Sequence, residues 1–263
     1  MENKLTQLKS RLKELGSVLI AYSGGVDSTL LSSVAHEILG ERALAVTASS
    51  PIFSPDEISQ AQSLARVVGI RHILIQTNEL EDPSFIANDP QRCYHCKRGL
   101  FQQLKRIAEA EGLYFVVDGT NYDDQGDFRP GRKAAEEFGV KSPLMEVSLT
   151  KGEIRTISRS RGLANWDKPS LPCFATRLPH GTPITIELIS LIATAEQSLA
   201  KLGLSQFRVR HHGNIARIEV SPRDMAFFAD ESIRLQVVAE LQALGYTYVT
   251  LDLAGYRAGS MKL

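Results

Sequence analysis

The stretch SVLIAYSGGVDSTLL, residues 17–31, decides the fold class. An apolar run stops at a serine, two glycines and an aspartate, and a helical pattern follows. Glycine adopts backbone angles that other residues resist, so the N–H groups around Gly24 and Gly25 can point into one concavity. The dipole of the following helix favours an anion there. The plainer alternative for a lone Gly-Gly pair is a tight turn between a strand and a helix. The turn predicts a phosphate site.

The type of phosphate motif narrows the chemistry. The stretch contains no G-x-x-x-x-G-K-[ST], so it is not a Walker A loop, and it is not G-x-G-x-x-G either. The hexapeptide SGGVDS resembles the PP-loop of the ATP pyrophosphatase superfamily. That resemblance implies cleavage of ATP between its α and β phosphates. The loop would stabilise the charge that develops on the departing pyrophosphate, while a substrate oxygen becomes an adenylate.

The same resemblance implies an ATP site at the ends of three predicted strands. Asp27 is expected to face Mg²⁺, which a polyphosphate site needs, and Ser28 is expected to act beside it in catalysis. We expect TASS (residues 47–50) to pass the adenine or ribose, and VDGTN (residues 117–121) to touch the nucleotide from a neighbouring strand. The predicted ATP-binding residues are Ala21, Ser23, Gly24, Gly25, Val26, Asp27, Ser28, Thr47, Gly119 and Thr120.

Strand and helix patterns alternate up to about residue 165, which predicts an α/β fold with a parallel sheet covered on both faces. The predicted strands are SVLIAYS, ALAVTAS, RHILIQT and YFVVDGT. The helices between them are residues 27–40, 54–69 and 97–112, and each ends in glycine. We therefore predict a PP-loop domain over residues 1–165, with ligands at the carboxyl ends of the strands.

The rest of the chain predicts a second, smaller domain. A linker with four prolines, residues 166–183, carries Cys173 and breaks the alternation. A helix over 184–203, strands over 206–212 and 215–221, a helix over 223–245 and a strand over 246–255 follow. This order predicts a small α+β domain over residues 184–263 with an antiparallel sheet, for substrate binding or oligomerisation.

Composition limits the classes of partner. The 263 residues carry 30 basic and 30 acidic side chains, so a large nucleic-acid footprint is not expected. The N-terminal residues 1–16 form an amphipathic helix pattern without an apolar leader, and no stretch reaches the ~18 apolar residues of a membrane span. These features predict a cytoplasmic protein without a membrane partner, in which three cysteines serve metal or sulfur chemistry rather than disulfides.

The cysteines allow four interpretations. Cys93 and Cys96 form C-x-x-C just before a predicted helix, and Cys173 follows 77 residues later than Cys96. A redox dithiol lacks its usual thioredoxin-like context. A zinc site would need a fourth ligand such as one of the histidines. Three thiolates on an iron–sulfur cluster would leave one iron open, and Cys173 as an ordinary buried thiol is the plainest alternative.

Longer motifs sharpen the resemblance. They are AYSGGVDSTLL, DGTNYDDQGDFRPGRKAA (residues 118–135), GLANWDKPS (residues 162–170), RVRHHGNIARIE (residues 208–219) and YVTLDLAGYRAGSM (residues 248–261). Over nearly the whole chain the sequence resembles the LarE family. These are ATP-dependent sacrificial sulfur transferases that help to make the nickel-pincer cofactor of lactate racemase.

The resemblance implies a pyridinium-3,5-biscarboxylic acid mononucleotide as substrate, adenylated on a carboxylate and converted to a thiocarboxylate. Arg208 and Arg210 lie two apart on a strand and so face one side, where they match the family's anion-binding pair. Glu219 matches an acidic position implicated in binding a divalent metal. A homohexamer built from trimers is also implied.

One departure from the family concerns sulfur. Sacrificial members give up the sulfur of a single cysteine in the proline-rich loop, where this chain has Cys173. The additional Cys93 and Cys96 match a variant thought to carry a [4Fe–4S] cluster whose open iron holds hydrosulfide. The alternative function is tRNA thiolation within the same superfamily. An amide-forming synthetase and a non-catalytic nucleotide sensor are more distant alternatives.

Overall fold

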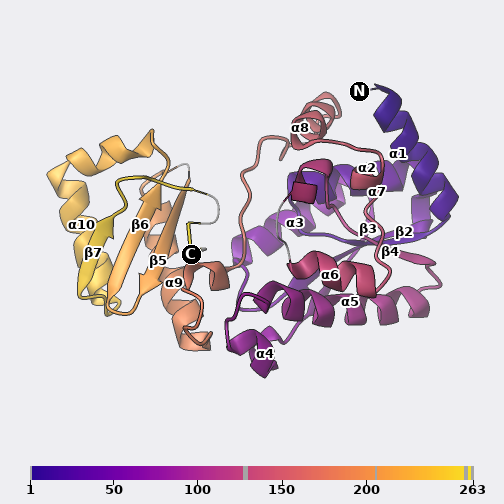
Figure 1. Ribbon diagram of the computed structural model, residues 1–263. Coiled ribbons are helices and arrows are strands. Elements are labelled where there is room, and N and C mark those ends of the chain that lie inside the picture. The colour runs from indigo at the N-terminus through magenta and orange to yellow at the C-terminus, as the bar shows by residue number, and fades with distance from the viewer. Residues whose placement is uncertain (1, 127–129, 205, 258–259, 262–263) are drawn as a thin grey trace. The chain divides into compact units, whose positions relative to one another are not determined.

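The computed structural model describes residues 2–126, 130–204, 206–257 and 260–261 (Figure 1). The chain divides into two compact units. Unit 1 comprises Met1–Asp82 and Gln91–Ser170, and unit 2 comprises Pro83–Pro90 and Leu171–Leu263. Asp127–Arg129 of the motif DGTNYDDQGDFRPGRKAA and Ala258–Gly259 of YVTLDLAGYRAGSM lie outside the described residues. Within those residues, no helix combines the length and apolarity needed to cross a membrane.

Unit 1 contains a four-stranded sheet in which every strand pair is parallel, in the order β3-β2-β1-β4. This confirms the predicted α/β class. The strands are β1 (Val18–Ala21), β2 (Ala43–Ser49), β3 (Arg71–Gln76) and β4 (Phe115–Val117). The helices are α1 (Glu2–Leu15), α2 (Val26–Leu39), α3 (Pro55–Val68), α5 (Arg92–Ala110), α6 (Pro130–Glu137), α7 (Pro143–Glu146) and α8 (Lys151–Ser160).

Helices cover both faces of this sheet because its strands are apolar on both sides. Val18 and Ile20 of β1 pack into one core with α1, α2 and α8, whereas Leu19 between them packs into a second core with α5 and α6. Figure 1 shows α1, α2 and α8 on one side of the sheet and α5 and α6 on the other. Alternate side chains of a strand point to opposite faces, so one strand supplies both cores.

The strand order places a topological switch point beside β1. The chain runs outward from β1 to β2 and β3, and then returns to β4 on the other side of β1. In open α/β sheets, ligands bind outside the carboxyl ends of strands at such a point. The predicted loop, residues 22–25, follows β1 directly and leads into α2. The fold therefore puts the loop at the position where a ligand is expected.

Unit 2 contains a three-stranded sheet of order β5-β6-β7 with a core between the sheet and two helices. The strands are β5 (Phe207–His212), β6 (Ile215–Val220) and β7 (Tyr248–Leu251), and the longer helices are α9 (Ile186–Ala200) and α10 (Glu231–Ala243). The short helix α4 (Pro83–Ile86) and the 3-10 turn η4 (Phe174–Arg177) also belong to this unit.

The antiparallel expectation for this sheet is only half right. β5 and β6 are antiparallel, but β6 and β7 are parallel. The connection between β6 and β7 carries α10, and a helical crossover returns the chain in the same direction, whereas a tight hairpin reverses it.

Two helix boundaries also differ from expectation. The single helix expected over 223–245 is a 3-10 segment η5 (Asp224–Ala229) followed by α10, which is capped by Asp230: its Oδ1 accepts from Ser232 N at 2.8 Å. A capping aspartate accepts from the first free N–H groups of a helix, so it marks a new start. Helix α5 begins at Arg92, so Cys93 and Cys96 lie inside its first turns rather than before it.

Candidate active site

The loop after β1 has the backbone geometry of an anion site. Gly24 has φ +69°, and a Cβ placed there would lie 2.6 Å from the Cβ of Ala61 in α3. Any larger residue at this position would therefore be strained and would also clash with α3. Gly25 is the N-cap of α2 and no side chain among the described residues caps that helix. The first N–H groups of α2 thus remain available to an anion.

Two serines line the same turn with hydroxyl groups. The Oγ atoms of Ser23 and Ser28 are 3.2 Å apart, and Ser28 Oγ donates to Gly25 O at 3.2 Å. The N–H of Ser23 donates to Ser28 Oγ at 3.3 Å. These long hydrogen bonds join residues 23–28 into one compact loop whose hydroxyls can rotate towards a phosphate.

Asp27, in the first turn of α2, forms an ion pair with Lys151, the first residue of α8. Lys151 Nζ lies 2.6 Å from Asp27 Oδ2, while Asp27 Oδ1 is buried without a hydrogen-bond partner in the described part of the chain. Burial raises the pKa of Asp27, with a smaller contribution from Asp124, whereas Lys151 and a side-chain hydrogen bond with Asn121 oppose the shift. The side chain is thus a half-buried carboxylate with one oxygen left open, in the sense that Oδ1 has no hydrogen-bond partner among the described residues.

That open oxygen fits a magnesium ion. Mg²⁺ is held in nucleotide sites by one or two carboxylates together with substrate phosphates and water. Asp27 supplies the carboxylate, and the charge of Asp124 is close enough to act on it. A metal bound here would shield the phosphates and polarise the bond to the leaving group.

The end of β4 closes the loop from the other side. A Cβ on Gly119 would lie 2.9 Å from the backbone N of Ser28, so only glycine lets β4 approach α2 this closely. Asp118 organises the turn by accepting from Thr120 Oγ1 at 2.9 Å and from Ser142 Oγ at 2.7 Å. The structure therefore brings Gly119 to the predicted loop, while the hydroxyl of Thr120 is engaged locally.

Thr47 lies at the carboxyl half of β2, next to β1. Its hydroxyl donates to Tyr22 O at 3.0 Å and lies 2.8 Å from His72 Nε2. Burial lowers the pKa of His72, so this imidazole is neutral at pH 7 and supports a buried hydrogen-bond chain. Here Thr47 fixes the residue that precedes the loop.

Sequence reasoning missed Lys151, Asp124 and His72. The ion pair between Asp27 and Lys151 joins positions 124 residues apart, and no local sequence pattern indicates such a pair. For the position of Lys151 alone, the sequence does contain a weak signal. Thr150 and Glu153 form the capping box of α8, so T-x-x-E in the sequence places Lys151 at a helix start.

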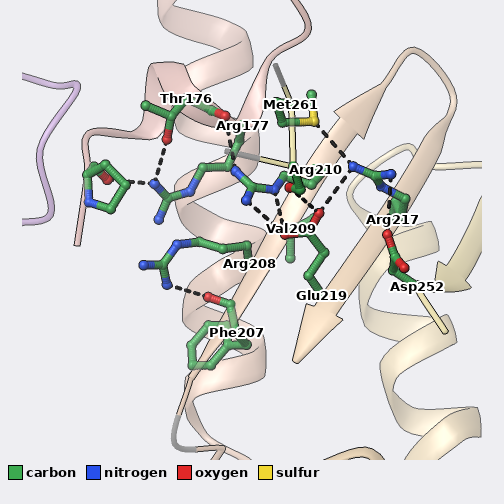
Figure 2. Close-up of polar contacts among 12 residues, drawn as sticks. Thr176, Arg177, Phe207, Arg208, Val209, Arg210, Arg217, Glu219, Asp252 and Met261 are labelled. Atoms are coloured by element: carbon green, nitrogen blue, oxygen red, sulfur yellow. Dashed lines mark hydrogen bonds and ion pairs between the residues drawn. The ribbon is translucent and has the colours of Figure 1, made fainter. Parts of the chain in front are cut away.

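Figure 2 shows a second polar site, in unit 2, on the face of β5 and β6 that carries their charged side chains. Glu219, fully buried, accepts from Arg210 Nη2 at 2.8 Å and from Arg217 Nη2 at 3.1 Å. Ser260 Oγ donates to the same carboxylate at 2.6 Å. The predicted pair Arg208 and Arg210 lies on β5, and the pairing register places Arg208 opposite Glu219.

The donor set around Glu219 does not suit a divalent cation. Both carboxylate oxygens already accept hydrogen bonds, and two of the three donors are guanidinium groups that would repel a second cation. The divalent-metal role that the family resemblance implies for Glu219 stays a prediction, and we derive no step from it. In this structure Glu219 orients Arg210.

A second buried ion pair connects the cysteine-bearing loop to β5. Arg177, 2 % exposed, makes a forked contact with Glu196 of α9, with Nε–Oε1 at 2.9 Å and Nη2–Oε2 at 2.8 Å. Its remaining nitrogen donates to the carbonyl of Cys173 at 3.1 Å, and Glu196 also accepts from Val209 N at 3.0 Å. The backbone of Cys173 is therefore tied to the strand that carries the two arginines.

Arg208 completes the charge of this site. Its guanidinium lies 5.1 Å from the ring centre of Tyr256, over the aromatic face. Burial lowers the pKa of Arg208, and the neighbouring charge of Arg177 lowers it further. Guanidinium groups stay charged through such shifts, so Arg177, Arg208 and Arg210 form a group of three cations, against the two anions Glu196 and Glu219, and this excess of positive charge suits a phosphate.

The three cysteines are divided between the two units. Cys93 and Cys96 lie three residues apart on α5 of unit 1, a spacing that puts both thiols on one helix face. Cys93 is exposed, Cys96 is half-buried, and Cys173 is half-buried in unit 2. None of them is in a disulfide. Across the described residues, no group of three or more His, Cys, Asp or Glu side chains forms a metal site.

Comparison with known proteins agrees with the geometry of unit 1. Residues 6–100, which contain the loop, match a family model described as asparagine synthase. One component of a glutamine-hydrolysing GMP synthase from Archaeoglobus fulgidus is 28 % identical over 178 residues, or 62 % of this chain and 56 % of the relative. The fold and the loop thus define an ATP-dependent enzyme of the PP-loop superfamily.

Relatives that match over almost their full length include the following two. An uncharacterised protein of Synechocystis is 46 % identical over 99 % of this chain and 97 % of its own. The pyridinium-3,5-bisthiocarboxylic acid mononucleotide synthase of Lactiplantibacillus plantarum, the LarE protein, is 37 % identical over 99 % of this chain and 94 % of its own. The chain belongs to the LarE family of PP-loop sulfur transferases.

Proposed function

We propose that this protein adenylates a carboxylate of pyridinium-3,5-biscarboxylic acid mononucleotide and converts it to a thiocarboxylate, a step in nickel-pincer cofactor synthesis and lactate racemase maturation. The observation that carries the proposal is the loop of residues 23–28, which leads into a helix without a side-chain cap and contains the half-buried Asp27 with its unpartnered Oδ1. The printed name of the Lactiplantibacillus relative supports the identity of the product.

The first step forms an acyl adenylate. A carboxylate oxygen of the substrate attacks the α-phosphorus of ATP, the bond from the α-phosphorus to the bridging oxygen breaks, and pyrophosphate leaves. Asp27 is proposed to hold Mg²⁺ on the phosphates, and the N–H groups of Gly25 and of the first turn of α2 are proposed to receive the departing charge. Ser28 is proposed to add its hydroxyl.

The second step replaces oxygen by sulfur. A sulfur nucleophile attacks the carbonyl carbon of the adenylate, the carbon–oxygen bond to the phosphate breaks, and AMP leaves with that oxygen. The remaining predicted ATP residues (Ala21, Ser23, Gly24, Val26, Thr47, Gly119 and Thr120) stay assigned to nucleotide binding as part of this proposal. A product-mass measurement with ATP and the biscarboxylate tests it: each exchange of oxygen for sulfur shifts the mass by the difference between the two atoms.

The arginines of unit 2 are proposed to hold the phosphate of the mononucleotide. Arg208 and Arg210 lie on one strand, are almost fully buried, and have Arg177 as a charged neighbour. Planar guanidinium groups bind phosphate through forked hydrogen bonds, which gives direction as well as charge. The expected result of Arg208→Ala is a rise of the substrate KM by about 10- to 100-fold, since a charge-assisted contact is worth ~1.5–3 kcal/mol.

The sulfur is proposed to come from a centre held by Cys93, Cys96 and Cys173. Thiolates are the usual ligands of iron–sulfur clusters, and the two thiols on one face of α5 fit this role. A [4Fe–4S] cluster with three protein ligands leaves one iron open, which supplies a place for hydrosulfide and permits repeated turnover.

Metal analysis of protein purified without oxygen tests the sulfur source. We expect roughly four irons and four acid-labile sulfides per chain, lost in Cys93→Ala. Zinc, or no metal with three titratable thiols, would exclude the cluster and make Cys173 the candidate sacrificial donor. A shift assay with bulk tRNA at moderate salt tests the alternative substrate; we expect no binding because the chain has equal numbers of basic and acidic residues.

We also propose a homohexamer built from trimers, as the family resemblance implies. Light scattering on the purified protein tests this assembly: six times the mass of the 29.0 kDa chain is expected, and a monomer would contradict it.

A further inference from the structure

The motif GLANWDKPS, residues 162–170, has no part in the chemistry proposed so far, yet one of its side chains touches the PP-loop. Asn165 lies in the turn that follows α8 and is 7 % exposed. Its Nδ2 donates to Gly24 O at 2.9 Å and to Thr29 Oγ1 at 3.0 Å. One amide group thus holds the loop at both ends, before Gly25 and inside the first turn of α2.

The contact with Gly24 fixes the direction of a particular peptide bond. A trans peptide is planar and points its C=O and N–H to opposite sides. With the carbonyl of Gly24 held by Asn165, the N–H of Gly25 faces the side where Ser23 Oγ lies, 3.3 Å away. A flip of this peptide would turn carbonyl lone pairs towards the phosphates, and a Gly-Gly pair resists such a flip less than any other.

Asn165 is suited to this role by its chemistry. Its amide nitrogen carries two N–H donors without a charge, and its Oδ1 is buried with no partner among the described residues. A buried amide with an unsatisfied oxygen contributes little to stability overall. A carboxylate of the same shape would lose both donors and place a negative charge against the Gly24 carbonyl.

The turn itself is anchored independently of the loop. Lys168 Nζ lies 3.3 Å from Glu57 Oε1 and 3.0 Å from Gln60 Oε1, both on α3. The guanidinium of Arg159 lies 4.9 Å from the ring centre of Trp166. The turn that carries Asn165 is therefore held by several contacts outside the loop, of which Lys168 supplies only some, and Lys168 offers a matched position in the same turn that does not touch the loop.

We propose that Asn165 is a positioning residue for ATP cleavage: it locks the Gly24–Gly25 peptide so that the Gly25 N–H faces the departing pyrophosphate. This inference rests on the proposed function of the loop. The group acts on charge that develops in the transition state, so its loss should lower kcat more than it raises the KM for ATP.

The test measures pyrophosphate release with ATP and pyridinium-3,5-biscarboxylic acid mononucleotide. For Asn165→Ala we expect kcat to fall about 30- to 100-fold, less than the roughly 10²- to 10³-fold for losing a preorganised donor itself, with the KM for ATP within about threefold. Asn165→Asp, nearly identical in shape, should lose at least as much. Lys168→Ala should keep kcat within about threefold. Emission of Trp166, the one tryptophan of the chain, reports whether the turn stays folded.

Two results would overturn the inference. One is wild-type kcat in a folded Asn165→Ala or, if that variant fails to fold, in Asn165→Asp. The other is an equal loss in Lys168→Ala, because the turn as a whole would then be responsible. Asp27→Asn, measured in parallel, separates this inference from the proposed function. If Asp27→Asn is also fully active, the loop assignment fails; if it is inactive while Asn165→Ala is wild type, only the role of Asn165 fails.

Discussion

The two polar sites described above are built in opposite ways. The loop in unit 1, residues 23–28, offers backbone N–H groups, the hydroxyls of Ser23 and Ser28, and the carboxylate of Asp27. The site in unit 2 gathers guanidinium groups from η4, β5 and β6 and balances them with buried Glu196 and Glu219. The first is a local structure without a formal positive charge of its own, and the second is a network of buried ions.

This difference predicts different consequences of mutation. The loop is built mainly from backbone and hydroxyl groups, so variants that keep its backbone geometry should change the rate and leave stability nearly unaltered. A buried ion network is satisfied only as a whole, and the loss of one member leaves a charge without its partner. Variants of unit 2 should therefore lower stability as well as activity.

The largest effect on rate is expected for Asp27→Asn. A bound metal ion supplies several kcal/mol of charge stabilisation, so pyrophosphate release should fall by about 10³-fold or more. The far-ultraviolet circular dichroism spectrum should not change, because burial raises the pKa of Asp27 and its charge is not a source of stability. Pyrophosphate formation at the wild-type rate would show that the loop is misassigned.

The largest effect on stability is expected for Glu219→Gln. The substitution removes the charge that balances Arg210 and Arg217, and breaking a buried pair costs about 3–5 kcal/mol. Asp252→Asn is the matched control, because Asp252 pairs with Arg217 at a more exposed position, 3.3 Å away. Its cost should be about 1 kcal/mol or less. If urea denaturation showed the same loss of unfolding free energy for Glu219→Gln and Asp252→Asn, the buried ion network would be contradicted.

Gly24→Ala, a substitution inside the loop, should lower stability as well as the rate. A left-handed backbone costs a non-glycine residue about 1–2 kcal/mol, and the added Cβ meets Ala61 at 2.6 Å. Gly25→Ala is the control, since Gly25 has φ −74° and its nearest contact is the rotatable hydroxyl of Ser23 at 3.2 Å. Thermal unfolding should rank Gly24→Ala clearly below Gly25→Ala. The reverse order would disprove the loop geometry.

The smallest effect concerns acid stability. Glu153 caps α8, next to Lys151, and the hydrogen bond from Lys4 lowers the pKa of Glu153 to about 2, with help from Thr150. A lowered carboxylate pKa contributes stability above the unfolded pKa of 4.5, and this contribution is lost as the pH falls towards 2. Glu153→Gln should flatten the plot of unfolding free energy against pH between pH 2 and pH 4.5, and it should leave the shape of this plot unchanged above pH 5.

Local signals explain what the sequence could predict. The four strands of unit 1 and the loop between β1 and α2 depend on patterns within a few residues, and the structure confirms these strands. The parallel pairing of β7 was missed because nothing in its own residues records which way a crossover returns. The break at Asp230 was missed because apolar residues continue past it, although an aspartate followed by Glu and Ser is a capping signal.

Contacts between distant residues explain what the sequence could not predict. Lys151 reaches Asp27 across 124 positions, and Asn165 reaches Gly24 across 141. In unit 2, Ser260 reaches Glu219 across 41 positions. The motif shows which residues form the loop, but the groups that neutralise and position them emerge only when the chain is folded.

The most direct test of the central claim follows one oxygen atom. The biscarboxylate substrate, labelled with ¹⁸O in its carboxylates, is incubated with ATP and sulfide, and the nucleotide products are analysed by mass spectrometry. Adenylation at the loop predicts AMP and pyrophosphate, with one ¹⁸O in the phosphate of AMP for each thiocarboxylate formed. ADP with inorganic phosphate, or AMP without the label, would contradict the account.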